Sequence, residues 1–87
     1  MNTTENIIDV FYKVKPSIDW KDASLHQLPL TGPQLKLTAP DLVYLVLELK
    51  ESFSIDFKKQ DFDNYRFNTV HTIIQTVESK VAEQNEG

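Results

Sequence analysis

The chain has 87 residues and a formal net charge of −4, from 13 acidic and 9 basic residues. This length suits one small domain, so we expect residues 1–87 to fold as a single unit. The acidic balance argues against a nucleic-acid-binding protein, because phosphate binding requires clustered lysine and arginine. The chain contains no cysteine, which excludes disulfides and thiolate chemistry.

The sequence gives no sign of a membrane or secreted protein. The first ten residues, MNTTENIIDV, contain neither a basic region nor a long apolar run, so they do not have the pattern of a signal peptide. No stretch approaches the roughly 20 apolar residues that cross a bilayer. We therefore expect a cytoplasmic protein that does not bind membranes.

The first predicted helix covers residues 4–14. Its apolar residues recur at i, i+3, i+4 and i+7, as on one face of a helix: Ile7, Val10, Phe11 and Val14. Either Thr3 or Thr4 is expected to cap its start. Pro16 ends the helix, because the residue before a proline is driven out of the α conformation.

Residues 15–37 form a long connection with three prolines and one glycine, which disfavour a continuous helix. Its many leucines, with Ile18 and Trp20, are too apolar to leave in water. We therefore expect an ordered loop that packs over the helices, with one short helical turn near residues 24–28. Trp20 is expected to anchor this loop, because an indole ring buries a large area.

The second predicted helix covers residues 41–53 and has a clear start signal. Thr38 is a natural N-cap, Pro40 suits an early position, and Asp41 completes a capping box with Thr38. The predicted buried stripe consists of Leu42, Leu45, Val46, Leu49 and Phe53. After the helix, Ile55 and Phe57 alternate with polar residues, as in a short extended segment.

The remainder of the chain predicts a short third helix or turn within residues 60–67 and a last helix that starts at Asn68 or Thr69. The last helix has the most regular apolar period: Val70, Ile73, Ile74, Val77 and Val81. These elements together predict an all-α bundle with a long first loop.

Candidate metal and catalytic residues are few. Asp56, Asp61 and Asp63 lack the spacing and glycine of a calcium-binding loop, so we expect them to be solvated. His26 and His71 do not have the spacing of a metal-binding pair, and no serine or carboxylate is placed to complete a catalytic triad. We therefore expect no metal site, no catalytic residue and no enzymatic activity.

The run DLVYLVLELKESFSIDF, residues 41–57, resembles the central recognition helix of acyl carrier proteins. Spacing and residue type agree over the fifteen positions 43–57, and the order of predicted elements is similar along nearly the whole chain. The resemblance implies an acyl-carrier-protein-like four-helix bundle with a short third helix. Leu30-Thr31-Gly32 is similar to a divergent branch, the acyl carrier-related proteins of bacterial peptide maturation systems.

The chain departs from the family pattern at the position that carries the cofactor. In the family, an Asp-Ser-Leu at the start of this helix carries 4'-phosphopantetheine on its serine. Thr38-Ala39-Pro40 stands there in this chain, and Ala39 has no hydroxyl. The resemblance therefore implies that no cofactor is attached. Thr38 is a weak alternative attachment site, since its hydroxyl is better explained as the helix cap.

A second departure concerns charge on the outer face of the same helix. The family usually presents acids there to basic partner enzymes, but Tyr44 replaces one acid and Lys50 interrupts the run. Ordinary fatty-acid synthase partners are therefore expected to bind less well.

The outer face of this helix is the candidate partner-binding site. Its predicted residues are Asp41, Tyr44, Leu47, Glu48 and Glu51. An aromatic and a leucine rimmed by acids suit a protein-binding surface. Alternatively, the long loop folds over Tyr44 and Leu47 and buries them. The sequence leaves both possibilities open.

These observations lead to a functional hypothesis and two alternatives. We expect a monomeric, non-enzymatic adaptor that binds proteins of a peptide-maturation or related biosynthetic system. The first alternative is a working acyl or peptidyl carrier, with 4'-phosphopantetheine on Thr38 or on a more distant hydroxyl such as Ser24. The second is a structural subunit or small helical regulator that is unrelated to carriers.

Overall fold

The computed structural model describes residues 3–58, 61 and 67–86. This part of the chain contains three α-helices, one 3-10 turn and no strand. The elements in chain order are α1 (Thr3–Val14), η1 (Ala23–Leu25), α2 (Ala39–Phe53) and α3 (Val70–Glu86). The structure confirms an all-α protein with a long connection between its first two helices. The predicted short third helix falls mostly on residues outside the described part.

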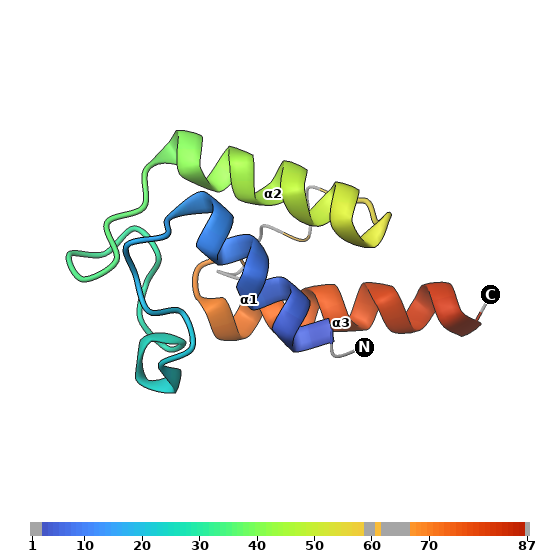
Figure 1. Cartoon of the computed structure of the whole chain (residues 1–87). Coiled ribbons are helices and arrows are strands. Elements are labelled where there is room, and N and C mark those ends of the chain that lie inside the picture. Colours follow the sequence, from blue (N-terminus) through green and yellow to red (C-terminus); the bar gives the residue numbers. More distant parts are fainter. Residues whose placement is uncertain (1–2, 59–60, 62–66, 87) are drawn as a thin grey trace.

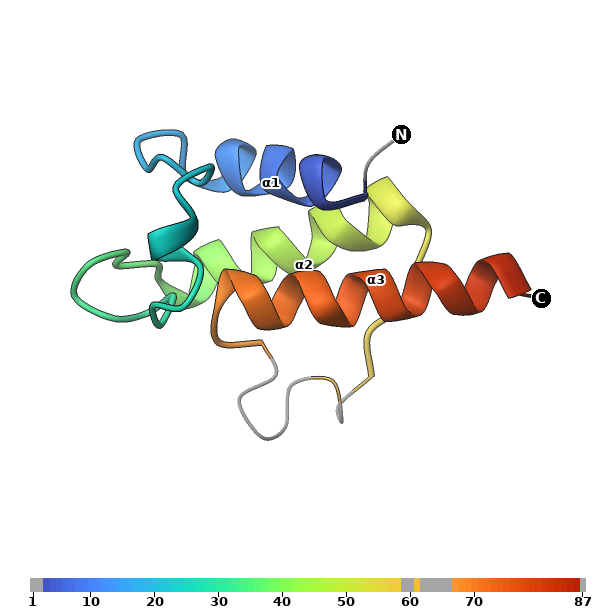
Figure 2. The ribbon, with the colours of Figure 1, turned by 90° about the horizontal axis from the view of Figure 1, so that it is seen from below.

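The three helices lie alongside one another, and α1 packs against both α2 and α3 (Figure 1). The helix α1 runs in the opposite direction to α2 and α3 (Figure 2). The long loop therefore lies at the end of the bundle where α1 finishes and the other two helices begin. Within the described residues, no helix is both long and apolar enough to cross a membrane.

Only one of the two ends of α1 agrees with the prediction from its sequence. The helix stops at Val14, two residues before Pro16, as predicted. Thr3 and Thr4 are its first residues rather than caps, so the predicted capping role is wrong. The buried face carries the predicted Ile7, Val10 and Phe11 together with Ile8, which was not predicted, whereas the predicted Val14 is half-buried.

The loop of residues 15–37 is ordered and contributes to the core, as its apolar content predicts. Trp20 is fully buried, with its ring centroid 4.8 Å from that of Phe11. Its indole N–H donates to the carbonyl of Lys15 at 2.9 Å, so the polar edge of the ring is also satisfied. Other buried loop residues are Leu30, Leu35 and Leu37.

The same loop supplies hydrogen bonds to the start of α3. The carbonyl of His26 accepts from the backbone N–H of His71 at 3.1 Å. The Thr69 hydroxyl accepts from the N–H of Thr72 at 3.1 Å and caps the helix. Because the first N–H groups of a helix lack partners within it, these contacts fix where α3 begins.

The segment after α2 is extended, as predicted. Ser54 adopts the left-handed conformation (φ 53) that ends the helix. Ile55 is buried and Phe57 half-buried, whereas Asp56 and Lys58 are exposed. With this alternation, one side of the segment packs against the core and the other side faces solvent.

Candidate functional site

The start of α2 forms the predicted capping box. The Thr38 hydroxyl accepts from the N–H of Asp41 at 3.3 Å, and the Asp41 carboxylate accepts from the N–H of Thr38 at 3.0 Å. Thr38, Ala39 and Pro40 are all exposed. The exposed head of the helix therefore presents a methyl group at position 39, beside a hydroxyl that already serves as a helix cap.

Hydrogen bonding favours the ionised form of the Asp41 carboxyl. The backbone N–H of Thr38 is the main cause that lowers the pKa of Asp41, and the nearby Lys15 ammonium acts in the same direction. The Lys15 ammonium also donates to the carbonyls of Leu35 and Lys36, each at 3.2 Å. Lys15 thus links the end of α1 to the backbone that leads into α2.

The outer face of α2 carries an exposed apolar strip, which we call the α2 stripe: Val43, Tyr44 and Leu47. Their exposed fractions are 59%, 48% and 58%, so the long loop does not cover them. The structure thus resolves the alternative that the sequence left open for Tyr44 and Leu47. Val43 was missed because it lies at the edge of the face, although its position one turn before Leu47 could have indicated it.

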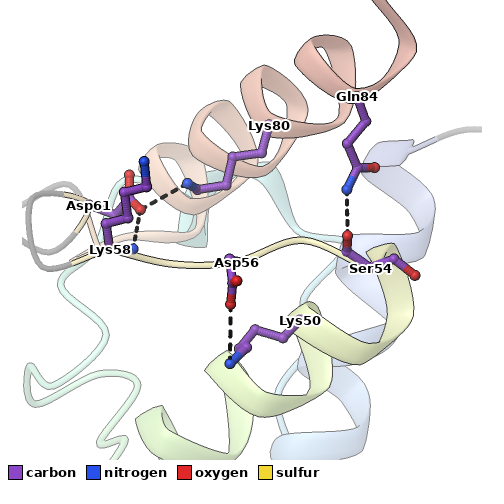
Figure 3. Close-up of polar contacts among 7 residues, drawn as sticks. All are labelled: Lys50, Ser54, Asp56, Lys58, Asp61, Lys80 and Gln84. Carbon is purple, nitrogen blue, oxygen red and sulfur yellow. Dashed lines mark hydrogen bonds and ion pairs between the residues drawn. The ribbon is translucent and has the colours of Figure 1, made fainter. Parts of the chain in front are cut away.

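The charged residues beside the α2 stripe make contacts within the protein. Glu48 pairs with Lys13 of α1 at 3.7 Å, and Lys50 pairs with Asp56 at 3.4 Å (Figure 3). Glu51 is exposed and forms no ion pair with the residues that the structure describes. Of the five predicted partner-binding residues, Tyr44, Leu47 and Glu51 are exposed, whereas Asp41 and Glu48 are partly buried.

A second polar cluster joins the segment after α2 to α3 (Figure 3). Lys80 of α3 pairs with Asp61 at 2.8 Å, and Asp61 also accepts from the N–H of Lys58 at 2.6 Å. The Lys80 ammonium lies 5.5 Å from the centre of the Phe57 ring. Asp61 is only 8% exposed, so the expectation that it is solvated is wrong.

This cluster has a structural role. The side-chain amide of Gln84 donates to the carbonyl of Ser54, which ties the end of α2 to the last turns of α3. An open groove beside the cluster is bordered by α2, the extended segment and α3, and Leu47 lies at its edge. The polar contacts therefore fix the position of the carboxyl-terminal half of α2, and with it the α2 stripe.

The two histidines lie where the long loop meets the start of α3. The Nε2 atom of His26 lies 2.7 Å from the carbonyl oxygen of Trp20, and the side chain of His71 is exposed. Among the described residues, no group of three or more histidines, aspartates or glutamates is arranged to hold a metal ion.

No protein-family model, curated protein or solved structure matches this chain. The structure therefore establishes a small all-α protein with three helices in its described part, but assigns no family.

Proposed function

We propose that this protein is a non-enzymatic, carrier-protein-like adaptor that binds a partner protein through the outer face of α2. The observation that carries the proposal is the exposure of Val43, Tyr44 and Leu47. Every other large apolar side chain in the described part of the chain is buried or half-buried. An apolar strip that a small protein leaves in water commonly marks an interaction site.

The carrier-like character draws support from the start of α2. This helix follows a long ordered loop and opens with a capping box, and its head is exposed as an attachment site would need to be. Ala39 at that head offers no hydroxyl. The module would therefore act through contacts alone, in the cytoplasm, within a peptide-maturation or related biosynthetic system.

The test is covalent capture of a partner in the native host. A photo-crosslinking amino acid at Ser52, on the same helix but outside the stripe, is introduced alone and together with Tyr44→Lys and Leu47→Asp. We expect the first protein to capture a partner and the second to lose it, because two buried charges at an apolar interface are unfavourable. Far-UV circular dichroism should show the same helical content for both.

A matched control, also with no change in net charge, carries Asp9→Lys on α1 and Lys21→Asp in the long loop, both at exposed positions. This variant should capture the partner as well as the unmodified surface does. Equal capture by the Tyr44→Lys, Leu47→Asp protein would show that the outer face of α2 is not the binding surface.

A further inference from the structure

We propose that the α2 stripe binds one amphipathic helix of another protein, and that apolar contact rather than charge attraction holds it. This inference rests on the proposed function, since it specifies the partner of the same surface. Two properties of the complex are specified: the bound element is a helix, and the affinity does not depend strongly on salt.

The spacing of the exposed residues favours a helical partner. Five exposed residues of α2 lie at i, i+3, i+4, i+7 and i+11: Pro40, Val43, Tyr44, Leu47 and Glu51. Side chains with this spacing form a ridge over about three turns of a helix. Such a ridge fits the groove between side chains of a second helix, whereas strand addition needs a free sheet edge, and the described residues contain no strand.

The charges beside the stripe favour a partner that does not depend on them. Asp41 is held by the cap at Thr38, Glu48 by Lys13 and Lys50 by Asp56. A partner charge would have to compete with each of these internal contacts. An ion pair between a partner and the exposed Glu51 would itself contribute little and be screened by salt, so apolar burial supplies the attraction.

The small size of the stripe favours another protein over a second copy of this chain. A standard stable interface uses roughly 20 to 30 residues on each side. The stripe offers three exposed apolar side chains on one helix, and Pro40 and Glu51 at its ends bring the number of residues to five. This is far fewer than a standard stable interface uses. The geometry therefore suits reversible binding of a single helix rather than a stable homodimer.

The test uses two synthetic peptides of about 15 residues, long enough to form a helix on binding. The first carries leucines at i, i+3, i+4, i+7 and i+11 among neutral polar residues, and the second is a scrambled version of it. Each is titrated into isotope-labelled protein and followed by amide chemical shifts. We expect saturable shifts at residues 41–51 with the first peptide and none with the scrambled one.

Salt and two matched variants separate apolar from charge-driven binding. Between about 0.05 and 0.5 M NaCl, we expect the Kd to change less than about threefold. Leu47→Asp should weaken binding at least about tenfold, since it removes apolar burial and adds a charge. Glu51→Gln on the same helix should change the Kd less than about twofold.

Several results would overturn the inference without touching the proposed function. They are an absence of shifts at residues 41–51, equal binding of the scrambled peptide, a tenfold loss of affinity at high salt, or a stable dimer in sedimentation. If capture of the native partner still required Tyr44 and Leu47, the proposed binding at α2 would be retained and only the proposal of an apolar, helical partner would be rejected. If capture did not require Tyr44 and Leu47, both proposals would be rejected.

Discussion

At the scale of single residues, position 39 decides which chemistry the head of α2 offers. Ala39 is exposed in the first turn, next to a threonine whose hydroxyl accepts the N–H of Asp41 at 3.3 Å. Under the proposed carrier likeness, attachment of a phosphopantetheine arm would need a free and accessible hydroxyl at this place. Ala39 is exposed and therefore accessible, but its methyl side chain provides no hydroxyl.

Restoring that hydroxyl tests the carrier likeness directly. We expect Ala39→Ser to gain the mass of one phosphopantetheine arm on incubation with coenzyme A and a broad-specificity transferase. The unchanged protein should gain nothing, because Thr38 is engaged in the cap. Intact-mass spectrometry makes the measurement, and an authentic acyl carrier protein is the control.

Either unexpected result would be informative. If Ala39→Ser stayed unmodified beside a modified control, the head of α2 would not resemble a carrier to the transferase. A mass gain on the unchanged protein, mapped to Thr38 or Ser24, would instead favour a working carrier.

At the scale of one element, α2 depends on charge at its first turn. The pKa of Asp41 is lowered from its ordinary value of 3.8, chiefly by the Thr38 N–H. A carboxyl with a lowered pKa in the folded state stabilises the protein above the ordinary pKa. That contribution disappears as the pH falls through the folded pKa, so it is lost in the range below about pH 4.

Asp41→Asn should therefore destabilise the protein near neutral pH and matter less in acid. A neutral amide accepts the Thr38 N–H more weakly than a carboxylate does, and it loses the favourable charge at the helix start. Urea unfolding at pH 7 and pH 3 makes the comparison, and we expect the gap between the two proteins to narrow at pH 3. Asp9→Asn, on the exposed side of α1, controls for loss of one negative charge. A gap that stayed constant with pH would show that the cap does not depend on ionisation.

At the scale of the whole molecule, the long loop completes the core and positions both helices that follow it. Trp20 packs on Phe11 of α1, and the carbonyl of His26 caps the start of α3. The Lys15 ammonium holds the carbonyls of Leu35 and Lys36, just before α2 begins. The loop therefore joins the ends of all three helices, and its anchoring affects the whole fold.

Trp20→Ala should destabilise the protein by about 3–5 kcal/mol, the usual cost of truncating a buried aromatic residue. Because native domains are stabilised by only about 5–15 kcal/mol, this loss should lower the unfolding temperature of the variant by many degrees. Trp20→Phe keeps most of the ring and loses the hydrogen bond to Lys15, at a cost of about 1–2 kcal/mol.

Thermal unfolding followed by circular dichroism ranks these two variants against Lys21→Ala at an exposed neighbouring position. Lys21→Ala should unfold at nearly the temperature of the unchanged protein. A Trp20→Ala protein as stable as the Lys21→Ala protein would contradict the anchoring role.

Local features of the sequence are sufficient to predict the helices and the ordered loop. Apolar residues at helical spacing placed α1, α2 and α3, and the Thr38–Asp41 capping box and Pro16 fixed two of their ends. These features are local, because spacing and caps act within one or two turns. The buried Trp20 was equally predictable, since no short chain leaves so large an apolar ring in water without cost.

The exposure of the α2 stripe and the pairing of Asp61 could not be predicted in this way, because both depend on the packing of distant segments. Helical period tells which residues oppose the buried side of α2, but not whether the distant loop packs over them. In the same way, the partner of Asp61 is Lys80 on a different element, and nothing local marks the pair. Both features depend on how segments far apart in the sequence pack together. The local pattern of residues carries no information about that packing.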